Sequence, residues 1–147
     1  MIRIRRGVEA GCKLVVIDSI NGYLNAMPGE RYLRNQLHEL ASYLNQQGVV
    51  TILVLAQQGF VAAIETLDLS YLSDTLVTLR YFEAFGEVKQ ALAVVKKRSG
   101  RHERTIREFK LESGKGICIG EPLKDFQGVL SGVPHFRGSE NQIIKAP

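Results

Sequence analysis

The stretch KLVVIDSINGYLNAMP, Lys13 to Pro28, decides the fold of this chain. Its apolar run, Leu14 to Ile17, reaches Asp18 without a polar interruption. Such a run is typical of a strand that is buried on both faces of a mostly parallel sheet. Asp18 then stands at the carboxyl end of the strand, and this is the end that faces the ligand crevice in open α/β sheets.

An apolar strand that ends in Asp is how P-loop nucleotidases present a carboxylate to Mg²⁺, the Walker B arrangement. We therefore assign Asp18 as a candidate metal ligand and catalytic residue, while a simple role in capping a turn or helix stays open. A second apolar strand over 49–55 is followed by Gln57. The Gln57 amide can contact a γ-phosphate or its attacking water, or it can form only a turn hydrogen bond.

Length and composition are those of one ordinary globular domain of 147 residues. No apolar run reaches the roughly 20 residues of a membrane-spanning helix, and the start of the chain lacks the apolar segment of a signal peptide. We therefore expect a cytoplasmic protein. Cys12 and Cys118 are far apart and have no metal-binding spacing, which favours buried free thiols.

The net charge of +4 is concentrated in the second half of the chain. Residues 96–110 contain seven basic residues against Glu103 and Glu108, a net charge of +5. Such a run indicates an anionic partner, which could be a nucleotide phosphate, a nucleic acid or an acidic protein surface. A solvated face is the alternative.

The remaining pattern predicts an α/β fold in which parallel strands joined by a helix crossover are followed by antiparallel hairpins. Residues 1–12 are typical of the end of a helix. Leucines four, seven and eleven residues after Leu33 place an apolar stripe on a helix that starts at Pro28 and ends at Gly48. This helix would connect the strands over 13–18 and 49–55 in a right-handed βαβ unit.

After a loop over 58–73, with a short helical piece over 64–71, the pattern changes to strands. Segments 75–82 and 88–97 predict a hairpin about Gly86, and segments 105–112 and 117–120 predict another. A short helix is expected over 121–134. Residues 135–147 are expected to fray.

The chain lacks the glycine-rich loop, GxxxxGK followed by Ser or Thr, whose backbone amides cradle phosphates. Its one Gly-Lys pair, Gly114 and Lys115, has Phe109 in place of the first Gly and Gly116 in place of the Ser or Thr. The pair is therefore interpreted as a hairpin turn.

Four stretches of the chain nevertheless resemble the KaiC-type ATPases of the RecA-like P-loop superfamily, which include the circadian-clock ATPase. In order, they are VVIDSINGYLNAMP, SDTLVTLRYFEAFGE from Ser73, VVKKRSGRHERTIREF from Val94 and DFQGVLSGVP from Asp125. The third stretch is the most specific, because two spaced basic residues followed by HE and IREF rarely occur together.

The resemblance implies that residues 1–134 are the C-terminal portion of an incomplete RecA-like domain, whose P-loop and paired catalytic glutamates would precede Met1. Alone, this portion is expected to be inactive. Family members form hexameric rings that bind ATP, with Mg²⁺, between subunits. By resemblance, Lys96 and Arg98 reach the γ-phosphate of the neighbour's nucleotide, His102 lies near its sugar and base, and Ser19 also binds nucleotide.

Two departures limit the resemblance. The adjacent Ser and Thr at which the clock protein phosphorylates itself are Ser70 and Tyr71 here, so two-site autokinase activity is in doubt. Phe85 stands where the clock protein has Arg in a turn. Two other function classes stay open. The first is a non-catalytic interaction module that pairs with a partner, including a signalling protein, through an exposed strand edge. The second is a nucleic-acid binder, which the scarcity of aromatic residues in the basic run disfavours.

Overall fold

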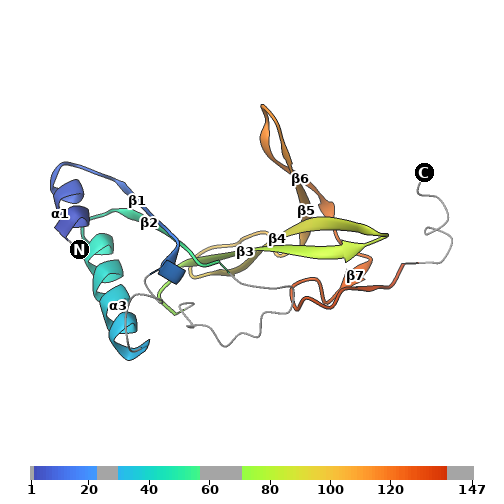
Figure 1. Cartoon of the computed structure of the whole chain (residues 1–147), viewed down its shortest axis with the longest axis horizontal. Coiled ribbons are helices and arrows are strands. Elements are labelled where there is room, and N and C mark those ends of the chain that lie inside the picture. Colours follow the sequence, from blue (N-terminus) through green and yellow to red (C-terminus); the bar gives the residue numbers. More distant parts are fainter. Residues whose placement is uncertain (1, 23–29, 57–70, 139–147) are drawn as a thin grey trace. The chain divides into compact units, whose positions relative to one another are not determined.

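The computed structural model describes residues 2–22, 30–56 and 71–138 (Figure 1). The chain divides into two compact units, residues 1–58 with 64–72 and residues 59–63 with 73–147. Each unit has its own hydrophobic core. No helix among the described residues is long and apolar enough to cross a membrane.

The first unit is a parallel strand pair joined through a helix. Its elements are α1 (Ile2–Glu9), β1 (Leu14–Asp18), α3 (Glu30–Gln46) and β2 (Val50–Val54). β1 pairs in parallel with β2 in a register that runs from Leu14 opposite Val50 to Asp18 opposite Val54. The parallel strands and the helix crossover predicted from the sequence are therefore confirmed.

One face of the β1–β2 sheet packs on apolar side chains of α3. Leu44 is fully buried, and Leu40 and Val49 complete a cluster against which Val15 and Ile17 of β1 pack. A second cluster is built on Ile20 and Leu37. Leu37, Leu40 and Leu44 of the helical stripe inferred from the leucine spacing thus lie on the buried side of α3.

The opposite face of the same sheet is exposed within the described residues. Side chains alternate along a strand, and those of Leu14, Val16, Val50 and Ile52 are between 46% and 63% exposed. The expectation that the first strand is buried on both faces is therefore wrong for the described part of the chain, because α3 covers only one face.

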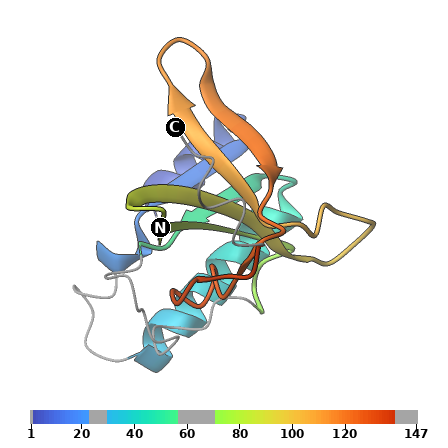
Figure 2. The same cartoon turned by 90° about the vertical axis from the view of Figure 1, so that its right-hand side faces the viewer.

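The second unit contains an antiparallel sheet in the order β3-β4-β5-β6. Its strands are β3 (Thr75–Ala84), β4 (Glu87–Lys97), β5 (Arg107–Glu112) and β6 (Gly116–Pro122). Phe85 and Gly86 form the first hairpin turn, and both have positive φ, 55° and 75°, as tight two-residue hairpin turns require. Figures 1 and 2 show the β5–β6 hairpin, in orange, projecting from the β3–β4 pair.

The helix expected over 121–134 is a wrong prediction. β6 extends to Pro122, and the chain then forms β7 (Phe126–Gln127), two turns with Gly128 and Gly132 at positive φ, and β8 (His135–Phe136). β7 and β8 pair in antiparallel orientation.

Aromatic packing explains why this segment is irregular rather than helical. The ring of Phe126 meets those of Phe82, Phe85 and Phe136 at centroid distances of 5.6, 5.7 and 5.3 Å, and Val129 is fully buried in the same core.

β8 includes the first two residues of the tail expected to fray, and residues 139–147 lie outside the described residues. The domain boundary at 134 stays a prediction.

The unequal faces of the β1–β2 sheet predict unequal effects of truncation. Leu44→Ala removes a fully buried side chain and should lower the free energy of unfolding by about 3 kcal/mol. Leu14→Ala, at a side chain 51% exposed, should lower it by less than about 1 kcal/mol. Urea unfolding monitored by circular dichroism measures both, and equal losses would mean that the outer face is covered.

Candidate functional site

Asp18 is exposed at the carboxyl end of β1, where the sequence predicted it. The backbone beyond it is fixed by Asn21, whose side-chain amide donates to the Ala56 carbonyl at 2.8 Å while its oxygen accepts from the Ala56 N–H at 2.8 Å. This pair ties the segment after β1 to the end of β2, so that both strand ends are held at one edge.

Two other predicted residues belong to this edge. Ser19 follows Asp18 directly, and its carbonyl accepts from the Gly22 N–H at 3.2 Å, at the start of the helical residues 20–22. Gln57 lies outside the described residues, and the residue opposite Asp18 in the register is Val54.

Asp18 can supply one oxygen ligand to Mg²⁺ but not a complete coordination shell. Among the described residues, no three His, Cys, Asp or Glu side chains gather closely enough to hold a metal ion. Mg²⁺ commonly takes one carboxylate together with water and the phosphates of its substrate. A single exposed carboxylate fits that mode and does not form a cage of its own.

Lys96 and Arg98 lie where β4 ends beside the start of β3. A β-bulge in the β3–β4 pairing, at Leu76 and Val77, falls next to Lys96, and such bulges re-aim side chains. The Lys96 ammonium donates to the Ser73 carbonyl at 2.9 Å. The Arg98 guanidinium forms an ion pair with Asp74 at 3.0 Å, and the Arg98 N–H donates to the Asp74 carbonyl at 2.7 Å.

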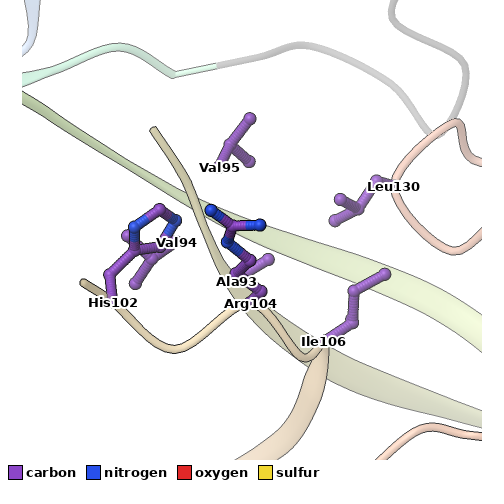
Figure 3. Close-up of a pocket in the computed structure, with 7 residues that line it drawn as sticks. All are labelled: Ala93, Val94, Val95, His102, Arg104, Ile106 and Leu130. Carbon is purple, nitrogen blue, oxygen red and sulfur yellow. The ribbon is translucent and has the colours of Figure 1, made fainter. Parts of the chain in front are cut away.

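His102 and Arg104 line a hollow of about 390 Å³ in the second unit (Figure 3). The two nitrogen-bearing side chains stand on one side of it, and Ile106 and Leu130 on the other. The remaining lining residues are apolar side chains of β4, Ala93, Val94 and Val95. An apolar floor beside two polar groups suits a flat ring with polar substituents.

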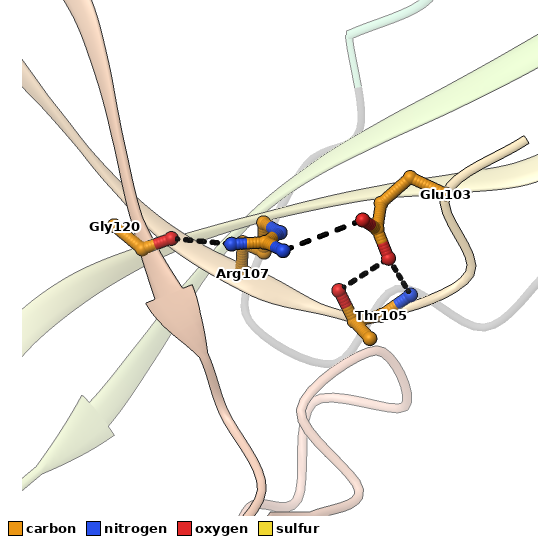
Figure 4. Close-up of polar contacts among 4 residues, drawn as sticks. All are labelled: Glu103, Thr105, Arg107 and Gly120. Atoms are coloured by element: carbon orange, nitrogen blue, oxygen red, sulfur yellow. Dashed lines mark hydrogen bonds and ion pairs between the residues drawn. The ribbon is translucent and has the colours of Figure 1, made fainter.

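Glu103, between these two residues, holds the loop in place (Figure 4). Its carboxylate accepts from the Thr105 hydroxyl at 2.7 Å, the Thr105 N–H at 3.0 Å and Arg107 at 3.3 Å. Arg107 also donates to the Gly120 carbonyl of β6 at 3.1 Å. The two Thr105 hydrogen bonds, followed by Arg107, lower the pKa of Glu103 to about 2.

The predicted site residues therefore fall into two groups that belong to different units. Lys96, Arg98 and His102 belong to the second unit, and Asp18 and Ser19 to the first. Sequence reasoning missed the residues that position these groups, namely Asn21, Asp74, Glu103, Thr105 and Arg107. The Glu103 to Thr105 contact resembles the turns in which Asn, Asp, Ser or Thr bonds the backbone two residues on, but a Glu at that position is not part of that pattern, so the sequence contains no local signal for it.

The strand order, the carboxylate at the end of β1 and the basic segment after β4 define the class as a RecA-like α/β protein. The chain belongs to the KaiC ATPase family, because the family model described as "ATPase: KaiC" matches residues 2–124.

Individual relatives agree with this assignment. The circadian clock protein KaiC3 of Synechocystis is 28% identical over 124 residues, which are 83% of this chain and 24% of that protein. The circadian clock oscillator protein KaiC of Synechococcus elongatus is 28% identical over 82% of this chain and 23% of its own length. The chain therefore spans about a quarter of the length of these curated relatives.

A solved structure is similar as well. The KaiC-like protein PH0186 of Pyrococcus horikoshii superposes with a TM-score of 0.67 at 28% identity, covering 80% of this chain and 51% of that one. The similarity supports the RecA-like fold over most of the chain.

The hydrogen bonds to Glu103 predict its titration. Because the pKa of Glu103 in the folded protein lies below the unfolded value, its contribution to stability is present above about pH 4.5 and is lost as the pH falls through about 2. Thr105→Val removes the hydroxyl and should raise the pKa of Glu103 towards its ordinary value. Carboxylate NMR titration of the wild type and the variant measures the difference. A pKa of Glu103 unchanged by Thr105→Val would contradict the hydrogen-bond assignment.

Proposed function

We infer that this chain supplies two parts of a KaiC-like ATP-binding and ATP-hydrolysing site, a Walker B carboxylate at Asp18 and a basic finger at Lys96 and Arg98 that acts on the nucleotide of a neighbouring subunit. The observation that carries this proposal is that both cations at the end of β4 contact the residues just before β3. Both side chains are anchored beside the first residues of β3, through Ser73 and Asp74.

The contacts of Arg98 are compatible with such a role. The Arg98 and Asp74 side chains are 59% and 69% exposed, and an ion pair this exposed contributes about 0 to 1 kcal/mol. A phosphate can therefore replace Asp74 at little cost. The guanidinium offers paired donors that match phosphate oxygens, and it stabilises most strongly the charge that develops during phosphoryl transfer.

Asp18 and Ser19 would serve the nucleotide bound by their own subunit. When bound, Mg²⁺ neutralises the charge of the phosphates. Asp18 would contribute one hard oxygen ligand from the strand end, in a position that the Asn21 to Ala56 hydrogen bonds hold. Gln57 would orient water or a phosphate near the end of the second strand.

The hollow beside His102 would take the base or sugar of the neighbour's nucleotide. Its apolar floor can contact a base ring, and His102 and Arg104 can meet polar edges of the same ligand. In this proposal, the partner is a neighbouring copy in a ring, because Asp18 and Arg98 serve different nucleotides.

A second candidate function rests on the exposed face of the β1–β2 sheet. Leu14, Val16, Val50 and Ile52 form an apolar surface of the kind that marks interaction sites. The chain would then be a non-catalytic module that binds a partner protein through this face. If the chain is such a module, its binding to the partner protein should not depend on Arg98.

The isolated chain should bind Mg·ATP poorly. It has no phosphate cradle of the GxxxxGK[ST] type, and one carboxylate with a basic finger cannot replace the backbone amides of that loop. Calorimetry on purified residues 1–147 should show no binding in the micromolar range. Micromolar affinity would overturn the division of roles proposed here.

In a polypeptide that joins this chain to the P-loop half of a KaiC-like relative, Arg98→Ala should reduce ATP hydrolysis by about 10³-fold or more and leave nucleotide affinity nearly unchanged. Lys97→Ala is the matched control, because Lys97 is adjacent and its ammonium donates to the Arg101 carbonyl at 3.4 Å instead of contacting Ser73 or Asp74. It should retain near-normal activity.

Mixing Arg98→Ala with Asp18→Ala subunits tests whether the finger acts in trans. Some mixed rings place an intact Asp18 site beside an intact Arg98 finger, so that part of the activity should return. Mixed rings that form and stay inactive would show that both residues serve one site in cis.

A further inference from the structure

β6 is an unprotected edge strand. It is the last strand in the order β3-β4-β5-β6, so that no described strand pairs with its outer side. In natural proteins, lysines, proline or a short length commonly prevent an edge strand from pairing with another chain. β6 has seven residues, contains no Lys or Arg, and has its proline only at the final position.

The other edge strand, β3, also exposes the apolar side chains of Val77, Leu79 and Tyr81. It differs in that it carries Arg80 and Glu83 within its length, whereas the central residues of β6 are Ile117, Cys118 and Ile119. Ile117 and Ile119 are 56% and 57% exposed, on a hairpin that projects from the sheet (Figure 2). An edge of this composition favours pairing with another strand.

The sequence of this edge reads the same in both directions. From Lys115 to Glu121 it is KGICIGE, symmetric about Cys118 except that its two ends carry opposite charges. In an antiparallel pair of two such strands centred on Cys118, each Ile117 stands opposite Ile119 of the other copy. Lys115, in the turn before β6, and Glu121 of the other copy then lie near each other at both ends of the contact.

Other registers lack this match. A shift of the centre to Ile119 places Ile117 opposite Glu121, and a shift to Ile117 places Lys115 opposite Ile119. Only the register centred on Cys118 places apolar residues opposite each other in the middle, a pairing that stabilises antiparallel strands, and brings the opposite charges of Lys115 and Glu121 near each other beside them.

We propose that β6 is a self-association site, through which two copies of this chain pair their β6 strands in antiparallel orientation about a two-fold axis at Cys118. The paired copies share a continuous eight-stranded sheet. This contact is isologous and does not depend on nucleotide, so it is distinct from the head-to-tail contacts of a ring.

The geometry makes Cys118 a reporter of the contact. Directly opposed residues of antiparallel strands have Cα atoms about 4.5 to 5.5 Å apart, so that the two Cys118 thiols of a dimer lie side by side. Cys118 is partly exposed and forms no disulfide. The other cysteine, Cys12, lies in the loop after α1, which makes it a natural control.

The first test is cross-linking of the purified chain with a short bismaleimide. Cys12→Ser should still give a covalent dimer, and Cys118→Ser should lose it. Cross-linking that persists in Cys118→Ser, or that disappears in Cys12→Ser, overturns the proposal.

The second test uses the opposite charges of Lys115, in the turn before β6, and Glu121, near the end of β6. Lys115→Glu and Glu121→Lys each create two like-charge contacts in a homodimer, so that each variant alone should dimerise about tenfold more weakly than the wild type in sedimentation velocity. In a mixture of the two variants, the heterodimer has two attractive contacts, and dimerisation should return to near the wild-type level.

Both substitutions are at exposed positions, and circular dichroism spectra like that of the wild type are the control for folding. Lys115 also forms an ion pair with Glu112 of its own hairpin at 2.6 Å. Lys115→Glu removes this ion pair, and mixing with the other variant does not restore it. Recovery of dimerisation on mixing therefore reports the contact between copies. A mixture as monomeric as either variant, or a wild type that stays monomeric up to millimolar concentration, rules out the β6 contact.

Discussion

The antiparallel pairing of β3 with β4 is the constraint on which the second unit depends. Ten residues of β3 are held against β4, and this register brings the first residues of β3 next to the last residues of β4. The cations at 96 and 98 owe their positions to it, because their partners, Ser73 and Asp74, lie immediately before β3. A change in that register would move both cations away from their anchors.

The loop after β4 shows how a strongly basic segment can keep a defined shape. Like charges repel, and a run with a net charge of +5 would spread without internal acceptors. Glu103 supplies such an acceptor, because its carboxylate binds Thr105 and Arg107 at once. Arg107 in turn joins the loop to β6 through the Gly120 carbonyl, so that the loop and the projecting hairpin are mechanically connected.

Apolar surface is unevenly covered in both units. The β1–β2 sheet is packed on one side by α3 and exposed on the other. In the second unit, β3 exposes Val77, Leu79 and Tyr81, and the β5–β6 hairpin exposes Leu111, Ile117 and Ile119. Exposed apolar area costs free energy in water, which is why such surfaces mark contacts with other chains or segments.

The sequence by itself determined the class, the parallel strand pair, the helix between the strands and the hairpins. Each of these depends on local periodicity and turn residues, such as the leucines of α3 and Gly86. The motif around Lys96 to Phe109 identified the family. These signals lie within short segments, so that they can be recognised without knowledge of the rest of the chain.

Tertiary structure alone decided how residues 121–138 pack within the second unit and which groups contact the candidate site residues. The helix predicted over 121–134 does not form, because Pro122, Gly128, Gly132 and Pro134 disfavour it and because Phe126 and Val129 are buried against β3 and β4. Asn21 and Ala56 are far apart in sequence, as are Arg98 and Asp74, and neither contact has a local signature. Contacts of this kind depend on which strands become neighbours, and only the folded chain settles that.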